Sequence, residues 1–224
     1  MSNHVGFRAY TNLKRPSAKL MEAFRDIPSS NIADQMGRLY NSGSALKALN
    51  RRPLLGPAFT VKLPQGDNLM LHYAMEIAKP GDILVVDGEG DLEHSLMGEM
   101  MATYCQKRGI GGLVIGGCVR DIDALEKMEI PIYAMGVTPQ GPYKNGPGEI
   151  NVPVSIAGLV VMPGDIIAGD ADGIVAIRPA DAEEIARAAR KKFEAESAAL
   201  EKGSFNKKWV LETIEKSEVQ IITQ

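Results

Sequence analysis

The sequence has few of the residues that build disulfide or metal frameworks, with two cysteines, three histidines and one tryptophan among 224 residues. Two cysteines are too few for a disulfide framework. Because Cys105 lies in a helical pattern and Cys118 borders a buried strand pattern, we expect two buried free thiols rather than a pair. His72 and His94 each lack a second histidine at ligand spacing, which excludes a histidine-rich zinc site and favours structural or surface roles.

Long apolar runs and an excess of either charge are also missing. No segment reaches the roughly 18 apolar residues that a membrane-spanning helix needs, and residues 1–16 contain no long apolar stretch. With 25 basic and 28 acidic residues the net charge is -3, so the overall charge does not favour nucleic acid or an anionic membrane. The net charge does not decide whether a local basic patch exists. We expect a soluble cytoplasmic protein that binds neither nucleic acid nor membranes.

The sequence does contain enough apolar residues for a full core, at 45% of the chain. Its length favours a single domain over residues 1–224, with the core at about 50–180 and a helical segment at about 180–216.

Strand and helix patterns alternate in the first half of this core. Strand patterns occupy residues 56–63, 83–86 and 113–115, and they are separated by a helix that begins at Asp67 and a helix from about His94 to Arg108. Such alternation predicts the α/β class, with helices packed on a parallel or mixed sheet.

The second half of the core is rich in short strand patterns. A short helix at 122–128 and a strand at 130–135 come first, and a loop rich in Pro and Gly and four short strands follow, at 138–149, 152–156, 159–162, 165–168 and 173–177. Helices that open at Pro16 and Ser29 predict an N-terminal helical cover. At the other end, a helix runs from Pro179 to about Lys202, Gly203 stops it, and an amphipathic segment at 209–216 comes last.

The most informative stretch, residues 111–121, is an apolar strand that ends in Arg120 and Asp121. Its glycines allow tight turns or close backbone approach, and Asp121 stands where the next helix begins. A guanidinium and a carboxylate side by side can bind an anionic substrate and a metal ion together. Strand ends followed by turns are also where open α/β folds commonly place their chemistry.

Several segments are specific when taken together: Gly56-Pro57-Ala58-Phe59-Thr60-Val61, Asp67-Asn68, Lys79-Pro80-Gly81-Asp82 through Asp87-Gly88, Gly98-Glu99, Gly117-Cys118-Val119-Arg120-Asp121 and Gly169-Asp170-Ala171-Asp172-Gly173. Through them the chain resembles, over roughly residues 30–200, the class II pyruvate aldolases typified by 4-hydroxy-4-methyl-2-oxoglutarate aldolase. That family also includes the regulator of ribonuclease E activity A and proteins once labelled demethylmenaquinone methyltransferases. Its aldolase signature is an acidic residue, twenty intervening residues and Arg-Asp, and Glu99 stands at that spacing from Arg120 where the family usually has Asp.

The resemblance implies a role for each matched residue. Asp121 would hold a divalent cation, Mg²⁺ or Mn²⁺, in a shell completed mostly by water and substrate oxygens. Arg120 would pair with the pyruvyl oxygens, because its fork of donors suits a carboxylate or an enolate. The backbone amides at a turn entering a helix would bind the substrate carboxylate, and they belong to Gly98, Glu99, Met100 and Met101.

The reaction implied is retro-aldol cleavage of a 4-hydroxy-2-oxo acid, which needs a base at the C4 hydroxyl and stabilisation of the pyruvate enolate. Arg120 and the metal meet the second need, and Glu99, acting through a metal-bound water, meets the first. Oxaloacetate decarboxylation yields the same enolate, so it is expected as a side activity.

The family also implies a fold and an assembly. The fold is a swivelling β/β/α domain, and the assembly is a homotrimer or homohexamer with sites between subunits. Glu194 and Glu196 both lie where the family's C-terminal helix lends an acid to a neighbouring site, and the sequence does not choose between them.

Other functions fit the residues less well. A non-catalytic regulator that binds an RNA-degrading enzyme is the main alternative, but the regulator branch lacks the Asp that follows the Arg, and this chain keeps Asp121. Lys62 and Lys79 show no sequence reason for the lowered pKa that a Schiff base needs. A dinucleotide fingerprint should follow a strand, whereas the Gly run at 109–112 precedes one, and no nucleoside pocket for a methyltransferase can be located.

Overall fold

The computed structural model describes residues 4–217, 219–220 and 222, and a mixed sheet forms its centre. Four parallel neighbours make the middle of this sheet: β3 (Leu54–Lys62), β4 (Ile83–Asp87), β6 (Gly112–Val119) and β7 (Ile132–Val137). Every residue of β4 and β6 is buried. Such continuously apolar strands are typical of parallel sheets that are covered on both faces.

Shorter strands extend the sheet at its margins. β8 (Gly148–Ile150) pairs antiparallel with β3, and β1 (Phe7–Ala9) pairs parallel with β8. At the other edge β2 (Lys47–Ala48) pairs antiparallel with β7. Inside the sheet, β5 (Ser95–Met97) lies parallel to the end of β6.

One face of the sheet is covered by a second layer of strands. This layer contains β9 (Val154–Ile156), β10 (Leu159–Val161), β11 (Ile166–Asp170) and β12 (Gly173–Ile177), and β11 joins it to the main sheet by pairing with β3. Val85 and Val114 of the sheet pack against Ile156 and Ile167 of the second layer.

The opposite face of the sheet is covered by helices. The neighbours of Val85 along β4, Leu84 and Val86, point to this side and share a core with α3 (Leu69–Ile77), α4 (Glu99–Lys107) and α5 (Ile122–Leu125). Adjacent strand residues thus serve two different cores, as the pleat requires. The layers are strand, strand and helix, so the expected α/β class with a β/β/α arrangement is confirmed.

A third core lies on the outer face of β11 and β12, where the predicted N-terminal helical cover is confirmed. α1 (Ala18–Glu22), α2 (Ser29–Gln35) and the first half of α6 (Ala182–Lys202) pack there. Ser17 begins α1 by accepting a hydrogen bond from the Leu20 amide. Gly203 ends α6, as predicted, and adopts the left-handed conformation.

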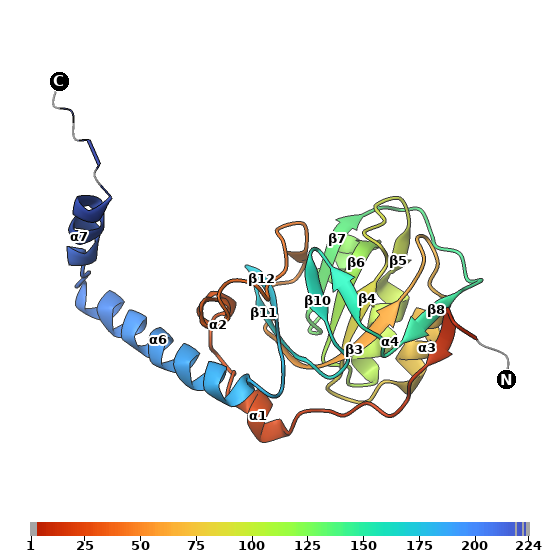
Figure 1. Ribbon diagram of the computed structural model, residues 1–224. Helices are drawn as coiled ribbons and strands as arrows, with labels where there is room; N and C mark the ends of the chain where they lie inside the picture. The colour runs from red at the N-terminus through yellow and green to blue at the C-terminus, as the bar shows by residue number, and fades with distance from the viewer. Residues whose placement is uncertain (1–3, 218, 221, 223–224) are drawn as a thin grey trace.

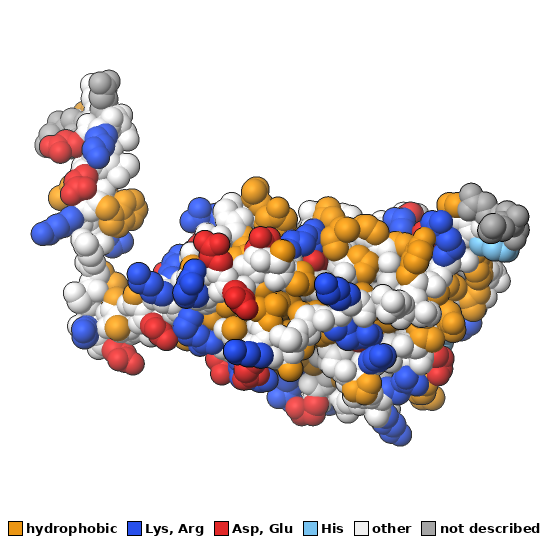
Figure 2. All heavy atoms as spheres, turned by 60° about the horizontal axis from the view of Figure 1, so that its bottom comes forward, with side chains coloured by type: hydrophobic (Ala, Val, Ile, Leu, Met, Phe, Trp, Pro, Cys, Tyr) orange, Lys and Arg blue, Asp and Glu red, His pale blue; other side chains and the backbone are white. Residues whose placement is uncertain are grey.

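The end of α6 and the following helix α7 (Lys208–Lys216) stand clear of the layered body (Figure 1). Figure 2 shows this C-terminal arm again, beside a body surface that carries both basic and acidic side chains. Large apolar side chains are exposed along the arm: Leu200, Phe205, Trp209, Leu211 and Ile214. Among the described residues no helix is long and apolar enough to cross a membrane.

The helix predicted from about His94 to Arg108 is wrong in its first turn. Residues 95–97 form β5, and α4 begins only at Glu99. The amide of Arg120 donates to the Met97 carbonyl, and the Ser95 amide and hydroxyl both donate to the Gln140 carbonyl. Partners from distant segments therefore satisfy this backbone, and tertiary pairing overrides the local helical pattern.

Both cysteines are buried free thiols, as predicted. Burial raises the pKa of Cys105 to about 12 and also raises the pKa of Cys118, so both remain protonated and unreactive at neutral pH.

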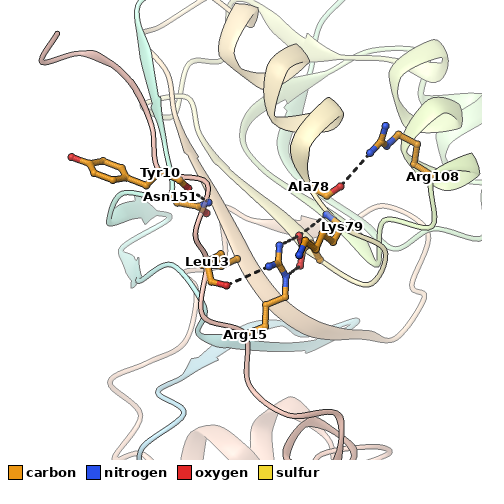
Figure 3. A network of polar contacts seen from close by, with 8 residues as sticks. Tyr10, Leu13, Arg15, Ala78, Lys79, Arg108 and Asn151 are labelled. Atoms are coloured by element: carbon orange, nitrogen blue, oxygen red, sulfur yellow. Dashed lines mark hydrogen bonds and ion pairs between the residues drawn. The ribbon is translucent and has the colours of Figure 1, made fainter.

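A buried ion pair fastens the N-terminal segment to the sheet (Figure 3). Asp82, fully buried at the start of β4, accepts from Arg15 Nε at 2.6 Å and Nη2 at 2.7 Å, and from the Lys79 amide at 2.8 Å. A buried carboxylate that loses its cation keeps most of its desolvation cost, and no opposite charge offsets that cost any longer.

We therefore expect Arg15→Ala to lower the free energy of unfolding by about 2 kcal/mol, measured by urea denaturation. The value lies below that of a fully buried pair because Arg15 is 23% exposed and the Lys79 amide remains. The control is Arg25→Ala, which breaks an exposed pair with Glu22 and should cost under about 0.5 kcal/mol. Equal losses in both variants would contradict an anchoring role for Arg15.

Candidate active site

Arg120 and Asp121 lie directly after β6, at the carboxyl ends of the parallel strands. Asp121 adopts the left-handed conformation, with φ of 62° and ψ of 39°, and is the residue at which α5 begins. This conformation is uncommon for residues other than Gly, Asn and Asp. It turns the Asp121 side chain back toward the start of α4.

The start of α4 and Asp121 are joined by a hydrogen bond. The Glu99 amide donates to Asp121 Oδ2 at 3.0 Å. Gly98, which precedes the helix, makes this approach possible, because a Cβ at that position would lie 2.3 Å from Asp121 Oδ2 and 2.9 Å from Arg120 Cγ. Gly98, which directly precedes the first residue of the signature, therefore provides the space in which Arg120 and Asp121 lie.

The two charged side chains of the pair are both accessible. Arg120 is 48% exposed and Asp121 is 45% exposed, with Arg120 Nε 3.8 Å from Asp121 Oδ2. At that separation in contact with water the two charges interact only weakly, so each remains available to a ligand.

A cavity of about 220 Å³ lies over this pair. It is small, which suits a ligand of a few carbon atoms. Its walls come from α3, β5, the start of α4, the end of β6 and the loop before β8, and the lining residues are Asn68, His72, Ser95, Leu96, Met97, Gly98, Met100, Met101, Arg120, Asp121, Pro142 and Lys144.

Most of the residues that the sequence singled out lie together at this cavity. Gly98, Met100, Met101, Arg120 and Asp121 line it. Glu99, the first residue of the signature, has an exposed side chain outside this lining, and its amide already donates a hydrogen bond to Asp121. The amides of Met100 and Met101 are thus the first-turn donors of α4 left for a substrate carboxylate.

The sequence analysis did not place three polar residues that line the cavity, Asn68, His72 and Lys144. Burial, together with the charge of Lys144, lowers the pKa of His72, so its imidazole is neutral at neutral pH. The nearest sequence signal was the spacing of Asn68 and His72, which places both on one face at the start of α3.

Asp121 can contribute to an oxygen-ligand metal site. One carboxylate oxygen accepts from the Glu99 amide, while Oδ1 has no hydrogen bond within the described part of the chain. No group of three or more His, Cys, Asp and Glu side chains that could hold a metal occurs among the described residues. A single carboxylate suits Mg²⁺ or Mn²⁺, which take oxygen ligands and, for Mg²⁺, keep several waters, and it does not suit a closed zinc site.

A larger cavity, of about 760 Å³, lies at the other end of the central strands, where Gly81, Gly111 and Pro131 precede β4, β6 and β7. Two arginines line it, but each is paired with a neighbouring carboxylate, Arg25 with Glu22 and Arg52 with Glu129. The smaller cavity is the stronger candidate because its charged groups remain available.

Comparison with known proteins decides the family. A family model described as Aldolase/RraA matches residues 29–176. The chain belongs to the RraA-like family. The match includes the whole cavity lining and the second layer of strands up to residue 176, and it ends before α6 begins.

Two relatives of this RraA-like protein carry aldolase names. The chain is 40% identical, over 75% of its length and 81% of the relative, to "Putative 4-hydroxy-4-methyl-2-oxoglutarate aldolase" of Halalkalibacterium halodurans. It is 36% identical, over 66% of its length and 92% of the relative, to "Putative 4-hydroxy-4-methyl-2-oxoglutarate aldolase 3" of Arabidopsis thaliana.

Solved structures of RraA proteins share its fold. Streptomyces coelicolor RraAS2, described as an unusual member of the RNase ES inhibitor RraA family, aligns with a TM-score of 0.76 at 27% identity, over 84% of this chain and 100% of that one. The RNA-processing inhibitor RraA from Thermus thermophilis aligns with a TM-score of 0.62 at 29% identity, over 66% and 91% of the two chains. The family thus has members with aldolase names and members described as inhibitors.

The two C-terminal glutamates differ in their surroundings. Glu196 accepts a hydrogen bond from Asn31 of α2 at 2.6 Å and lies 3.6 Å from Lys192. Glu194 is exposed on the same helix. Glu196 would have to leave Asn31 to reach a neighbouring subunit, so Glu194 is the less constrained of the two, and the choice between them stays a prediction.

Proposed function

We propose that this RraA-like protein is a divalent-metal-dependent aldolase that cleaves a 4-hydroxy-2-oxo acid, such as 4-hydroxy-4-methyl-2-oxoglutarate, to pyruvate and a second 2-oxo acid. One observation carries the proposal. The left-handed Asp121 places its carboxylate beside Arg120 and the start of α4, so a carboxylate, a guanidinium and helix-terminal amides meet at one small cavity. The aldolase names of its relatives support the same assignment.

Each group has a task at the pyruvyl half of the substrate. The amides of Met100 and Met101, at the positive end of α4, bind the C1 carboxylate. Arg120 donates hydrogen bonds to the C2 oxygen and stabilises the negative charge that develops there as the C3–C4 bond breaks. Asp121 would hold the divalent cation, which when bound supplies a Lewis acid beside the same oxygen.

Proton transfer from the C4 hydroxyl is assigned to Glu99 in this proposal. The residue is the first of α4 and lies between Gly98 and Met100, which line the cavity, and its extra methylene relative to Asp gives the carboxylate additional reach. Oxaloacetate decarboxylation leaves the same pyruvate enolate beside Arg120, so we expect it as a side activity. We also expect assembly as a homotrimer or homohexamer, since the exposed apolar side chains of the C-terminal arm would then be buried against a neighbouring subunit. The expected location stays the cytoplasm.

The second candidate is a regulator that binds an RNA-degrading enzyme and has no catalytic activity. The inhibitor descriptions of two structural neighbours favour it. The accessible Asp121 and its cavity favour the aldolase, because a purely docking protein has no need of a carboxylate in a left-handed conformation beside a helix terminus.

Pyruvate release distinguishes the two functions. The purified protein is incubated with 4-hydroxy-4-methyl-2-oxoglutarate or oxaloacetate, and pyruvate is followed by a coupled dehydrogenase assay. We expect turnover with added Mg²⁺ or Mn²⁺, loss of turnover with excess chelator, and recovery when the metal is restored. No turnover of either substrate with either metal would overturn the aldolase.

A further inference from the structure

The 138–147 loop crosses the candidate active site from one side of the central sheet to the other. It leaves β7 and enters β8, and β6, β4 and β3 lie between those two strands in the order of the sheet (Figure 1). Because β8 runs antiparallel to β3, it begins at the carboxyl end of β3. The loop therefore passes over the carboxyl ends of the central strands, where Arg120 and Asp121 lie.

The loop also touches the groups at the cavity. Pro142 and Lys144 form part of the cavity lining. A Cβ at Gly141 would lie 3.3 Å from Arg120 Nη1, so the loop backbone is within contact distance of the guanidinium. A loop displaced from this position would open the cavity on that side and expose Arg120 further to water.

Both ends of the loop are fixed in the sheet. At one end the Thr138 amide donates to the Val119 carbonyl at 3.0 Å. At the other end the Gly148 amide donates to the Gly6 carbonyl at 2.7 Å, and β8 continues from there as a partner of β3. Any movement of the loop is therefore confined to the residues between these two attachments.

Between its ends the loop is held by hydrogen bonds and has little apolar packing. None of its residues, all of which lie in the described part of the chain, is buried, and most are exposed. The Gln140 carbonyl accepts from the Ser95 amide and hydroxyl, each at 2.8 Å, and the Tyr143 amide donates to the Gly66 carbonyl at 2.7 Å. Segments with few buried apolar contacts and accessible hydrogen bonds open at low free energy, independently of the core.

The contacts with a charged acceptor all involve Asp67, which is 4% exposed. Asp67 Oδ2 accepts from the amides of Asn145 at 2.6 Å and Gly146 at 3.0 Å. Its other oxygen, Oδ1, accepts from the Leu69 amide at 2.9 Å, at the start of α3. Hydrogen bonds to a carboxylate are roughly twice as strong as those between neutral groups, so Asp67 contributes most to holding the loop down.

The Asp67 carboxylate would also be satisfied with the loop lifted. Water would then replace the Asn145 and Gly146 amides at Oδ2, while the Leu69 amide would remain, because it belongs to the same short segment as Asp67. No charge is left buried without a partner in either arrangement. Two arrangements that both satisfy this carboxylate can lie close in free energy.

We propose that the 138–147 loop is a lid that opens and closes over the cavity as one unit, and that Asp67 is the latch that holds it closed. The closed lid limits the access of water to Arg120, and the open lid admits substrate and releases product. Asp67 is a positioning residue, since it contacts the loop and not the ligand. What passes the lid rests on the proposed function, whereas the opening itself does not.

Hydrogen exchange of the wild-type protein tests the lid without any substrate. We expect the Asn145 and Gly146 amides to exchange about 10- to 100-fold more slowly than in an unstructured peptide, as for an open state populated to about 1–10%. Amides of β6 should exchange only on global unfolding. Pyruvate and Mg²⁺, added at about 10 times the dissociation constant of pyruvate, should slow exchange in the loop about 10-fold further, because the closed state binds the ligand.

Asp67→Asn should remove most of this protection at Asn145 and Gly146, while β6 stays protected. The amide has the same size as the carboxylate, but when its oxygen accepts from Leu69 its NH₂ group faces two donors. The KM of pyruvate release should rise about 2- to 10-fold as the closed fraction falls. The value of kcat should stay within about 2-fold, because the groups at the cavity are unchanged.

Two further variants show whether the effect belongs to the latch. Ser95→Ala removes one of two hydrogen bonds to Gln140 and should speed exchange in the loop by less than Asp67→Asn does. Asp172→Asn makes the same chemical change at an exposed residue between β11 and β12, and it should leave both exchange in the loop and KM at their wild-type values.

The outcomes separate the lid from the reaction. Loop amides that exchange only together with β6 would overturn the lid, and so would wild-type exchange of the loop in Asp67→Asn. The aldolase would stand in both cases if pyruvate is still released. If the loop opens independently and Asp67→Asn opens it further, but no substrate is cleaved, the lid stands and the proposed reaction is wrong.

Discussion

Asp121→Asn is expected to lower the kcat/KM of metal-dependent pyruvate release on the order of 1000-fold, since it removes the one carboxylate at the cavity that can hold the cation. The substitution changes the charge of the side chain but little else. Asn is nearly the same size, tolerates the left-handed conformation that Asp121 adopts, and can still accept from the Glu99 amide. The backbone and the start of α4 should therefore be preserved, and only the charge is lost.

The measurement is steady-state kinetics over a range of Mg²⁺ concentrations, with circular dichroism and a thermal melt as evidence of folding. The matched control is Asp123→Asn, which removes the same charge from an exposed residue in the first turn of α5. It should leave kcat/KM within about 2-fold, as is usual for a surface charge away from the site. An Asp121→Asn variant with full activity at ordinary Mg²⁺ concentration would show that Asp121 is not the ligand.

Much of the fold follows from the order of apolar segments in the sequence. Strands 83–86 and 113–115 and the helix between them were predicted because continuous apolar runs indicate strands buried on both faces. The β5 strand was missed, since Ser95, Leu96 and Met97 adopt it only through pairing with the end of β6. β1 and β2 were missed for the same reason. Each has two or three residues and depends on a neighbour distant in sequence.

The residues of the candidate site also fall into a group that the sequence predicted and a group that it did not. Arg120, Asp121 and the start of α4 could be predicted because a strand end, a spacing and a family motif all mark them. Asn68, His72 and Lys144 could not, because each is an ordinary polar residue and only the fold of the 138–147 loop against Asp67 brings them together. Burial without a partner, the property that distinguishes Asn68 and His72, is defined by tertiary structure alone.

Gly98→Ala is expected to reduce kcat/KM at least about 100-fold while the protein remains folded, because displacement of catalytic groups by about 1 Å has effects of that size. Gly98 has φ of -144° and ψ of -164°, an extended conformation open to any residue, so the new methyl group introduces no backbone strain. It does, however, fall 2.3 Å from Asp121 Oδ2 and 2.9 Å from Arg120 Cγ, and both side chains must move. Steady-state kinetics should therefore show both a lower kcat/KM and a changed dependence of the rate on Mg²⁺ concentration.

Gly203→Ala is the matched control, because it shows whether the loss of activity comes from the position of Gly98 at the cavity or from replacing any glycine. Gly203 has φ of 59° at the end of α6, and a Cβ there has no atom within 4 Å. Gly203→Ala should therefore cost about 1 kcal/mol of stability through strain alone and leave kcat/KM unchanged. Gly98→Ala should show the reverse, a large loss of activity with a small change in the urea midpoint. If Gly98→Ala kept its activity, Arg120 and Asp121 could move aside and still function, and the close packing of Gly98 against them would have no catalytic importance.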